Sequence, residues 1–273
     1  MVKNYSLGVV GLGFVGNAVY TSFSDLGANI KGYDVKGGPN TFEETIRDSE
    51  IIFLCLPAPT VESGNVDYSI YETVLKESKE IIDNSIIRSR GRIFCLKGTL
   101  PPGTCEALNK KYELNIINNV EFLTARTAIE DFKTQSQIVL GGCKPDVDFV
   151  AAMYSAYFPD SSITKCTSTT AEMIKYTCNV FYATKISFFN EIYKMCEHLN
   201  INYNEVMTGC LKNGWINPTH TLVPGTDGDF GYGGMCFPKD IKALAKFFSD
   251  KDIVCDTMKG AIKTNKKVRN GRN

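Results

Sequence analysis

The chain has 273 residues, of which 43% are hydrophobic and 22% charged, and its 30 basic residues balance its 30 acidic ones. This length allows two domains of ordinary size. The charge balance gives no field that would favour nucleic acid or a membrane surface. No apolar run approaches transmembrane length, and the N-terminal MVKNYSLGVVGLG lacks the features of a secretory leader. We therefore predict a globular protein that binds neither nucleic acid nor membrane.

The ten cysteines are scattered along the chain, and none forms a C-x-x-C pair. A chain of this length without a leader is expected to keep them as thiols in a reducing compartment, so we predict a cytoplasmic location. His198 and His220 lie far apart and have no partnering cysteine or carboxylate pattern. We therefore predict no metal site.

Short apolar runs alternate with helix-like segments in the first half of the chain, a pattern typical of a parallel sheet with crossover helices. The predicted strands cover 6–12, 29–34, 51–56, 92–96, 114–118 and 137–142, and the predicted helices cover 17–26, 42–48, 68–82, 104–112 and 145–157. The sequence thus predicts an α/β domain over residues 1–167.

The second half begins with more than thirty residues that contain neither glycine nor proline, which predicts one long helix. Thr169 and Glu172 form a capping-box pattern at its start. An apolar stripe recurs along it at helical spacing: Phe181, Phe188, Ile192, Met195 and Leu199. We expect most of this stripe to pack in the core of its own domain. The stripe could instead form a subunit interface, and for this reason we predict a homodimer through the long helix.

Three shorter helices are predicted after the long one, at 204–211, 239–248 and 257–267. A polar loop rich in Gly, Pro and Asn separates the first of these from the second. The basic tail KTNKKVRNGRN is expected to fray. We therefore predict an all-helical domain over residues 168–273, built on the long helix.

The segment GLGFVG (11–16) is a G-x-G-x-x-G that directly follows the first predicted strand and precedes a helix. Such glycines make the tight turn, let the backbone approach a pyrophosphate and allow close helix–strand packing. Asp34, at the end of the second strand, can accept both ribose hydroxyls, which favours NAD over NADP. The sequence therefore predicts a Rossmann-type NAD site. Its predicted contacts are Gly11, Gly13, Phe14, Val15, Gly16 and Asp34.

The segment GYGGMCFPKD (231–240) places a cysteine between a glycine cluster and the expected start of a helix. The glycines allow the backbone to take positive φ and to come close to another molecule. Pro238 suits the first turn of a helix. Cys236 is therefore expected where a helix N-terminus favours the reactive thiolate. The alternative is a buried structural cysteine beside a glycine turn.

A lysine, an amide, a carboxylate and this thiol form a set that can oxidise an alcohol beside a nicotinamide. Lys175 and Asn179 are four apart on the long helix and share one face. Such a pair can stabilise an alkoxide while a hydride leaves. A thiolate can then trap the aldehyde and allow a second oxidation, to a thioester that water opens. Asp240 lies four residues after Cys236. Taken singly, the lysine and the amide also suit a helix surface, and Asp240 also suits a cap.

Six segments together resemble the UDP-glucose/GDP-mannose dehydrogenase family over nearly the whole chain. They are GLGFVG, LPAPT (56–60), KGTLPPGT (97–104), VEFLTARTAIEDF (120–132), AEMIKYTCN (171–179) and GYGGMCFPKD, in this order. The resemblance implies an enzyme that oxidises the C6 hydroxyl of a nucleotide sugar such as UDP-glucose to a carboxylate, with two NAD consumed per substrate.

The resemblance also implies roles for individual residues. Cys236 would be the nucleophile and Asp240 would orient the water. Glu121 would act in thioester hydrolysis, and Thr99 would support the water and the nicotinamide side. Pro57 and Thr99 are further predicted cofactor contacts. The predicted substrate contacts are Glu121, Phe122, Leu123, Lys175, Asn179, Tyr232 and Gly233.

The sequence departs from the family pattern mainly in the groups that hold the nucleotide. The family usually carries a third domain that grips the substrate's nucleotide, and this sequence is expected to lack it. Val120 replaces the usual proline, Ala125 replaces a second glutamate, and an arginine is replaced near Trp215. Either the substrate is held differently, or a separate chain supplies the missing domain, or the protein is a truncated remnant.

Two other functions remain open. A dehydrogenase of the 3-hydroxyacid kind shares a Rossmann domain, a helical domain and a Lys-x-x-x-Asn pair, but it has no need of the cysteine motif. A non-catalytic NAD-binding module that partners another protein would keep the glycine loop and leave Cys236 unreactive.

Overall fold

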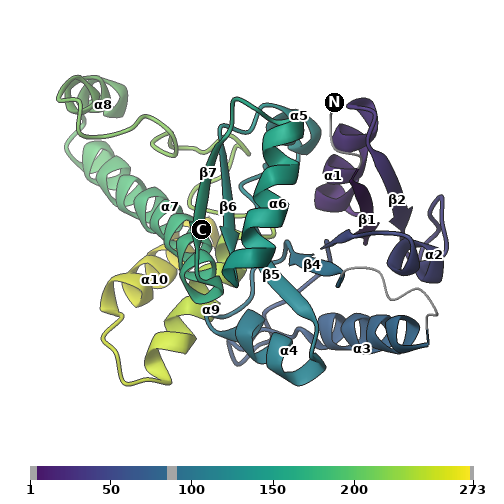
Figure 1. The fold of residues 1–273 in the computed structure, drawn as a ribbon. Helices are drawn as coiled ribbons and strands as arrows, with labels where there is room; N and C mark the ends of the chain where they lie inside the picture. Colours follow the sequence, from purple (N-terminus) through teal and green to yellow (C-terminus); the bar gives the residue numbers. More distant parts are fainter. Residues whose placement is uncertain (1–4, 85–90, 271–273) are drawn as a thin grey trace. The chain divides into compact units, whose positions relative to one another are not determined.

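The computed structural model describes residues 5–84 and 91–270 and divides into two compact units (Figure 1). The first unit comprises Met1–Pro59 and Val66–Lys175. The second comprises Thr60–Asn65 and Tyr176–Asn273. The boundary falls inside the long helix α7 (Ser168–His198), so this helix contributes to both units.

The first unit contains a seven-stranded sheet in the order β2-β1-β3-β4-β5-β6-β7. Its strands are β1 (Ser6–Val10), β2 (Asn29–Tyr33), β3 (Ile51–Leu54), β4 (Ile93–Leu96), β5 (Asn115–Val120), β6 (Gln137–Gly141) and β7 (Ser162–Cys166). Among the strands that the structure describes, only the β5–β6 pair is antiparallel. The predicted α/β fold with a mostly parallel sheet is confirmed. The edge strand β7, SITKC, was not predicted, because it has no fully buried residue and no apolar run.

In the described part of this unit, six helices accompany the sheet: α1 (Phe14–Asp25), α2 (Phe42–Arg47), α3 (Ser69–Asp83), α4 (Thr104–Tyr112), α5 (Ala128–Lys133) and α6 (Lys144–Tyr157). Only the short α5 was not predicted. One aromatic cluster joins α1, α5, α6 and the sheet. The centroid of the Phe23 ring lies 5.7 Å from that of Phe53, 5.8 Å from that of Phe132 and 5.9 Å from that of Tyr154. Each such pair contributes roughly 0.5–1.5 kcal/mol beyond its buried area. This core fixes α1, and with it the loop between β1 and α1.

The described helices of the second unit are the rest of α7, α8 (Tyr203–Lys212), α9 (Phe237–Ser249) and α10 (Asp256–Asn270). The all-helical prediction is thereby confirmed. The described part of the basic tail belongs to α10, which continues as a helix to Asn270, and residues 271–273 lie outside the described residues. None of the helices in the two described ranges is long and apolar enough to cross a membrane.

The predicted capping box at the start of α7 is wrong. The hydroxyl that caps the helix belongs to Thr167, which accepts from the Thr170 amide at 3.2 Å. Glu172 is buried and points away from this terminus, because its carboxylate accepts from the amides of Gly103 and Cys105 at the start of α4. A long-range partner has overridden the local pattern.

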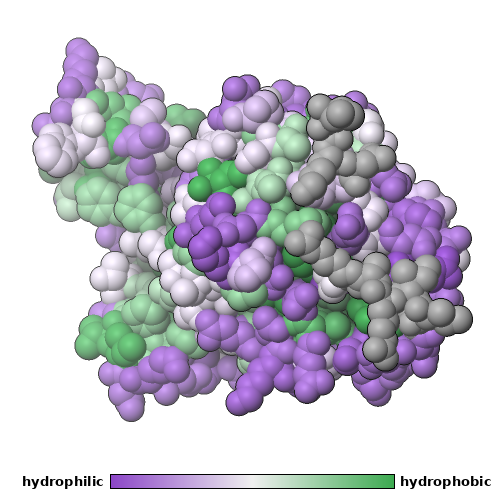
Figure 2. Space-filling model, in the orientation of Figure 1, coloured by the Kyte–Doolittle hydropathy of each residue, from purple (hydrophilic) through white to green (hydrophobic). Residues whose placement is uncertain are grey.

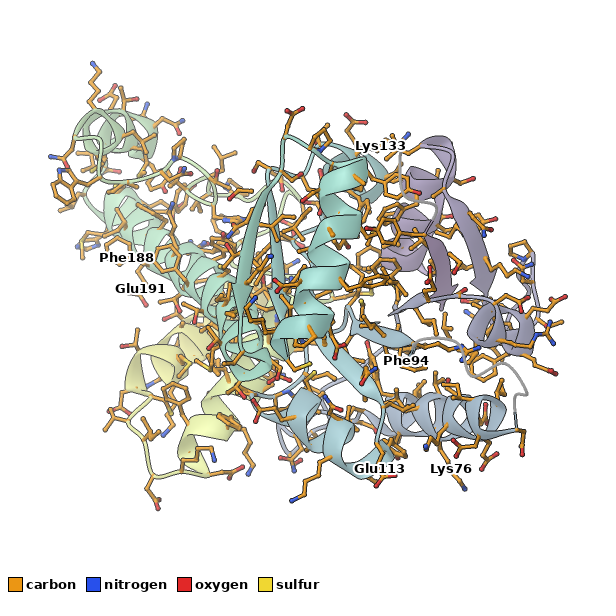
Figure 3. All side chains as sticks on the ribbon, viewed as in Figure 1. Lys76, Phe94, Glu113, Lys133, Phe188 and Glu191 are labelled. Atoms are coloured by element: carbon orange, nitrogen blue, oxygen red, sulfur yellow. The ribbon has the colours of Figure 1, made fainter. Side chains whose placement is uncertain are left out.

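The apolar stripe of α7 also differs from its expected core role. Ile192 packs in the second unit's core cluster. The other four members are more than half exposed: Phe181 (59%), Phe188 (53%), Met195 (54%) and Leu199 (56%). Figure 2 shows apolar surface over the part of α7 that Figure 3 marks with Phe188 and Glu191. Exposed side chains of this size along one helix are typical of an interaction surface.

Candidate functional site

The glycine loop between β1 and α1 is shaped by close backbone contacts. Gly11 has φ +90°, and a Cβ there would lie 2.6 Å from the carbonyl oxygen of Cys55. A Cβ on Gly16 would lie 1.7 Å from the carbonyl oxygen of Gly11. Gly13, the N-cap of α1, is exposed, and a Cβ on it would meet nothing within 4 Å. Two glycines are therefore required by the fold, whereas the third keeps space open in front of the helix N-terminus.

The residues around this loop fit an NAD molecule. No acidic residue lies in the first turn of α1, so its N-terminus can receive a pyrophosphate without repulsion. Asp34 follows β2, and its carboxylate accepts from the amides of Leu12 at 2.7 Å and Lys36 at 2.9 Å. These hydrogen bonds lower the pKa of Asp34, and the one from the Lys36 amide has the largest effect. Asp34 is thus held as a carboxylate beside the loop, where a ribose would need an acceptor.

Lys175 and Glu121 form a buried pair in the first unit. The Lys175 Nζ lies 2.9 Å from Oε1 of Glu121 and also donates to its backbone carbonyl at 2.7 Å. The other carboxylate oxygen accepts from the Leu123 amide at 2.8 Å. Both charged side chains are 8% exposed. The Lys175 ammonium also lies 5.5 Å from the ring of Phe122, which is 38% exposed. The structure therefore brings together four of the predicted substrate contacts.

Asn179 and Asp240 form the corresponding pair in the second unit. The Asn179 amide donates to Oδ2 of Asp240 at 2.6 Å, and Lys239 Nζ lies 2.5 Å from Oδ1. Asp240 is fully buried, and Asn179 is 5% exposed. A buried carboxylate needs such partners, since an unpaired charge would carry a large desolvation cost. Asn179 is therefore a fixed partner of Asp240 and not the helix-surface residue that the spacing also allowed.

Cys236 is the N-cap residue of α9 and is half-buried. Its carbonyl oxygen accepts from the Asp240 amide at 2.9 Å, which closes the first helical turn. Pro238 lies in this turn, as predicted. The backbone of α9 therefore fixes the distance from Cys236 to the buried carboxylate one turn later.

Other predicted residues lie at strand ends or in the glycine segment. Pro57 is exposed beyond β3, and Thr99 is buried beyond β4. Tyr232 is buried, and burial raises its pKa to about 12. A Cβ on Gly233 would lie 2.1 Å from Arg269 Nη2. A side chain at this position would therefore displace the Arg269 guanidinium.

Two family models match consecutive parts of this chain. The NAD-binding domain of the UDP-glucose/GDP-mannose dehydrogenase family matches residues 37–158, and the central domain of that family matches residues 169–267. The two matches follow one another with a short gap, and together they take in most of the chain.

Curated relatives and a solved structure agree with these matches. A UDP-glucose 6-dehydrogenase of Rickettsia felis is 32% identical over 235 residues, which cover 83% of this chain and 50% of that protein. A GDP-mannose 6-dehydrogenase of Pseudomonas aeruginosa is 30% identical over 229 residues, covering 79% and 50%. The structure of a UDP-glucose dehydrogenase from Pyrobaculum islandicum matches with a TM-score of 0.86 at 26% identity, over 97% of this chain and 68% of that one. The chain spans about half the length of the curated relatives it matches.

Proposed function

Because the chain belongs to the UDP-glucose/GDP-mannose dehydrogenase family, we propose that it oxidises the C6 hydroxyl of a nucleotide sugar, of the UDP-glucose type, to a carboxylate. NAD, held at the glycine loop and Asp34, would supply the hydride acceptor for both oxidations. The observation that carries the proposal is the start of α9, where Cys236 begins the helix and Asp240 is buried against Asn179 one turn later. A structural cysteine has no need of that buried acid–amide pair.

The first oxidation converts the alcohol to an aldehyde. The C6 carbon gives up a hydride, and its hydroxyl loses a proton. In the proposal the Lys175 ammonium and the Asn179 amide stabilise the alkoxide oxygen as the hydride leaves. The contact between Lys175 and Glu121 supports this role, since it holds the ammonium in one place. Phe122 and Leu123 would line the sugar.

The second oxidation proceeds on the enzyme. The Cys236 sulfur adds to the aldehyde carbon, and the oxygen takes up a proton, giving a thiohemiacetal. Loss of a second hydride and of that proton gives a thioester. Water then adds to the thioester carbonyl, and the thiol leaves with a proton, which releases the carboxylate. Asp240 would orient this water, with Glu121 assisting hydrolysis and Thr99 supporting the water on the nicotinamide side. The sum is two hydrides transferred and one water consumed per sugar.

We further propose that the chain divides into an NAD-binding part, 1–167, and a helical part, 168–273. The exposed stripe of α7 supports a homodimer, because Phe181, Phe188 and Met195 recur at intervals of seven and a second copy can cover them with its own stripe. All ten cysteines are free thiols, which supports a reducing compartment such as the cytoplasm. We also propose that the residues that bind the nucleotide part of the substrate come either from this chain or from a separate chain.

NADH formation against a panel of UDP- and GDP-sugars tests this function. The proposal expects one nucleotide sugar to give NADH, and it expects an Asp240→Asn variant to lose this activity while it keeps its affinity for NAD. Tight NAD binding without NADH from any sugar would instead favour a non-catalytic module. Turnover of a small 3-hydroxyacid would favour the related dehydrogenase class.

A further inference from the structure

The glycine segment ahead of Cys236 is held by side chains from two helices of the second unit. Asn190 of α7, which is 1% exposed, accepts from the Gly231 amide at 2.9 Å. Asn265 of α10 accepts from the Tyr232 amide at 2.6 Å and donates to the Tyr232 carbonyl at 3.1 Å. A single side-chain amide thus satisfies both backbone groups of one residue, as a neighbouring β-strand would.

Arg269 contacts the same segment one turn further along α10. Its Nη1 donates to the carbonyls of Phe230 at 3.3 Å and Gly231 at 3.5 Å. Its Nη2 donates to Asp227 at 2.8 Å and lies 3.7 Å from Asp229. The guanidinium is therefore anchored at one end by two carboxylates while its other end holds two backbone carbonyls.

The glycines match these side chains. A Cβ on Gly231 would lie 2.2 Å from Oδ1 of Asn265, and a Cβ on Gly233 would lie 2.1 Å from Nη2 of Arg269. A Cβ on Gly234, in contrast, would meet nothing within 4 Å. A Cβ on Gly231 or Gly233 would therefore displace the α10 side chain that holds the segment, and Gly231 also has a φ of +68° that favours glycine, whereas a Cβ on Gly234 would meet open space.

We infer that Asn265 and Arg269 are positioning residues, which fix the backbone before Cys236 so that the thiol is presented in one place. Tyr232, four residues before Cys236, is held by Asn265, and Asp240, four residues after it, is held by Asn179. The cysteine is therefore anchored on both sides. The inference rests on the proposed role of Cys236 as nucleophile, and it assigns to α10 a part in that chemistry.

The test measures how fast iodoacetamide alkylates each cysteine, resolved by mass spectrometry, in the wild type and in Asn265→Ala. Loss of the two hydrogen bonds to Tyr232 is expected to speed alkylation of Cys236 about fivefold or more, since the freed segment opens more often. Cys196, which is 4% exposed in the second unit, reports unfolding in the same sample and should stay protected. The matched control is Lys267→Ala, an exposed position on the same helix, which should change neither rate.

The opposite effect is expected in turnover with the nucleotide sugar. In Asn265→Ala, kcat should fall about tenfold or more while KM changes little, because a displaced nucleophile slows the chemical steps more than it weakens binding. A residue that served the fold alone would lower the melting temperature and leave kcat per folded molecule unchanged. An unchanged kcat therefore overturns the inference, as does an unchanged alkylation rate at Cys236.

A double-mutant cycle tests the match between Gly233 and Arg269. Gly233→Ala should displace the guanidinium and speed Cys236 alkylation about as much as Arg269→Ala does. The double variant should then be no faster than either single variant, since the clash disappears with the guanidinium. Effects of the two substitutions that multiply in the double variant would contradict this match between Gly233 and Arg269. Full activity in Cys236→Ser would show that Cys236 is not the nucleophile. The alkylation rates are measured in variants that keep Cys236, so they would still show whether Asn265 and Arg269 position it. A failure of the proposed function is therefore distinguishable from a failure of this inference.

Discussion

Lys175 and Glu121 hold each other in the interior of the first unit, with Nζ 2.9 Å from Oε1 and 2.7 Å from the Glu121 carbonyl. One lysine thus contacts both the side chain and the backbone of the residue that follows β5. Phe122 and Leu123 come next in the chain, so the direction of this loop depends on the ion pair. The ion pair therefore orients the loop after β5, and both of its residues also have proposed roles in catalysis.

The first prediction concerns the stability that this pair provides. Lys175→Ala should lower the free energy of unfolding by about 3–5 kcal/mol, because it leaves the Glu121 carboxylate buried without its partner. Urea unfolding at neutral pH measures the loss. Lys144→Ala is the control, since it removes a lysine that is 86% exposed, from its pair with Asp148. That change should cost under about 1 kcal/mol. Equal effects at the two sites would contradict a buried pair.

The second prediction separates the glycines of the nucleotide loop. Gly13→Ala should leave the melting temperature nearly unchanged, because its Cβ meets no protein atom within 4 Å and its φ of −63° suits alanine. Its NAD affinity should nevertheless fall about tenfold or more, since the methyl group stands where the pyrophosphate approaches.

Gly16→Ala is the matched counterpart in the same loop. Its Cβ would overlap the Gly11 carbonyl, so the fold itself should be destabilised by roughly 1–3 kcal/mol or more. Calorimetric titration with NAD and thermal unfolding of both variants give the comparison. Unchanged NAD affinity in Gly13→Ala would mean that the pyrophosphate does not approach this backbone.

The third prediction concerns pH. Burial raises the pKa of Glu172 from 4.5 to about 7, even though the amides of Cys105 and Gly103 favour the carboxylate. Because the folded pKa lies above the unfolded one, the contribution of this group is fully present below about pH 4.5 and is lost as the pH rises through about 7. The free energy of unfolding of the wild type should therefore fall across this window, relative to that of Glu172→Gln.

Glu106 provides the control for this effect. Its charge is a further, smaller cause of the raised pKa of Glu172. Glu106→Gln should therefore move the window to lower pH without abolishing it. A difference between wild type and Glu172→Gln that does not depend on pH would show that Glu172 keeps an ordinary pKa.

The fourth prediction concerns the stripe of α7. Phe188→Asp should leave a folded chain, since this side chain is 53% exposed, but it should convert the proposed dimer to a monomer in analytical ultracentrifugation. The charge would be buried without a partner in the interface. Lys194→Asp, at an exposed position on the same helix outside the stripe, serves as the control. A monomeric wild-type protein would contradict the proposed homodimer.

Local sequence was sufficient for the nucleotide end of the molecule. The turn at Gly11, the packing at Gly16 and the strands on either side depend on neighbours within the motif, and the structure has all of them. The long helix was equally predictable, because nothing in its sequence interrupts it. The start of α9 at Cys236 followed from Pro238 and the glycines before it.

Partners distant in sequence account for what was missed. Glu172 matched a local capping box, but the amides that it binds lie 67 and 69 residues away. Asn265 and Arg269 lie in a segment that resembled a basic tail, and they hold the glycine segment 33 or more residues earlier. The periodicity of hydrophobic residues in the sequence does not predict such long-range hydrogen bonds.

The central claim is that Cys236 carries the second oxidation, and the direct measurement is the number of NADH formed per nucleotide sugar consumed. The account predicts two NADH per sugar in the wild type, with a carboxylate as the product. In Cys236→Ser, whose hydroxyl is a far weaker nucleophile, it predicts that turnover to the carboxylate is lost while NAD affinity is retained. Two NADH per sugar from Cys236→Ser at the wild-type rate would contradict the account.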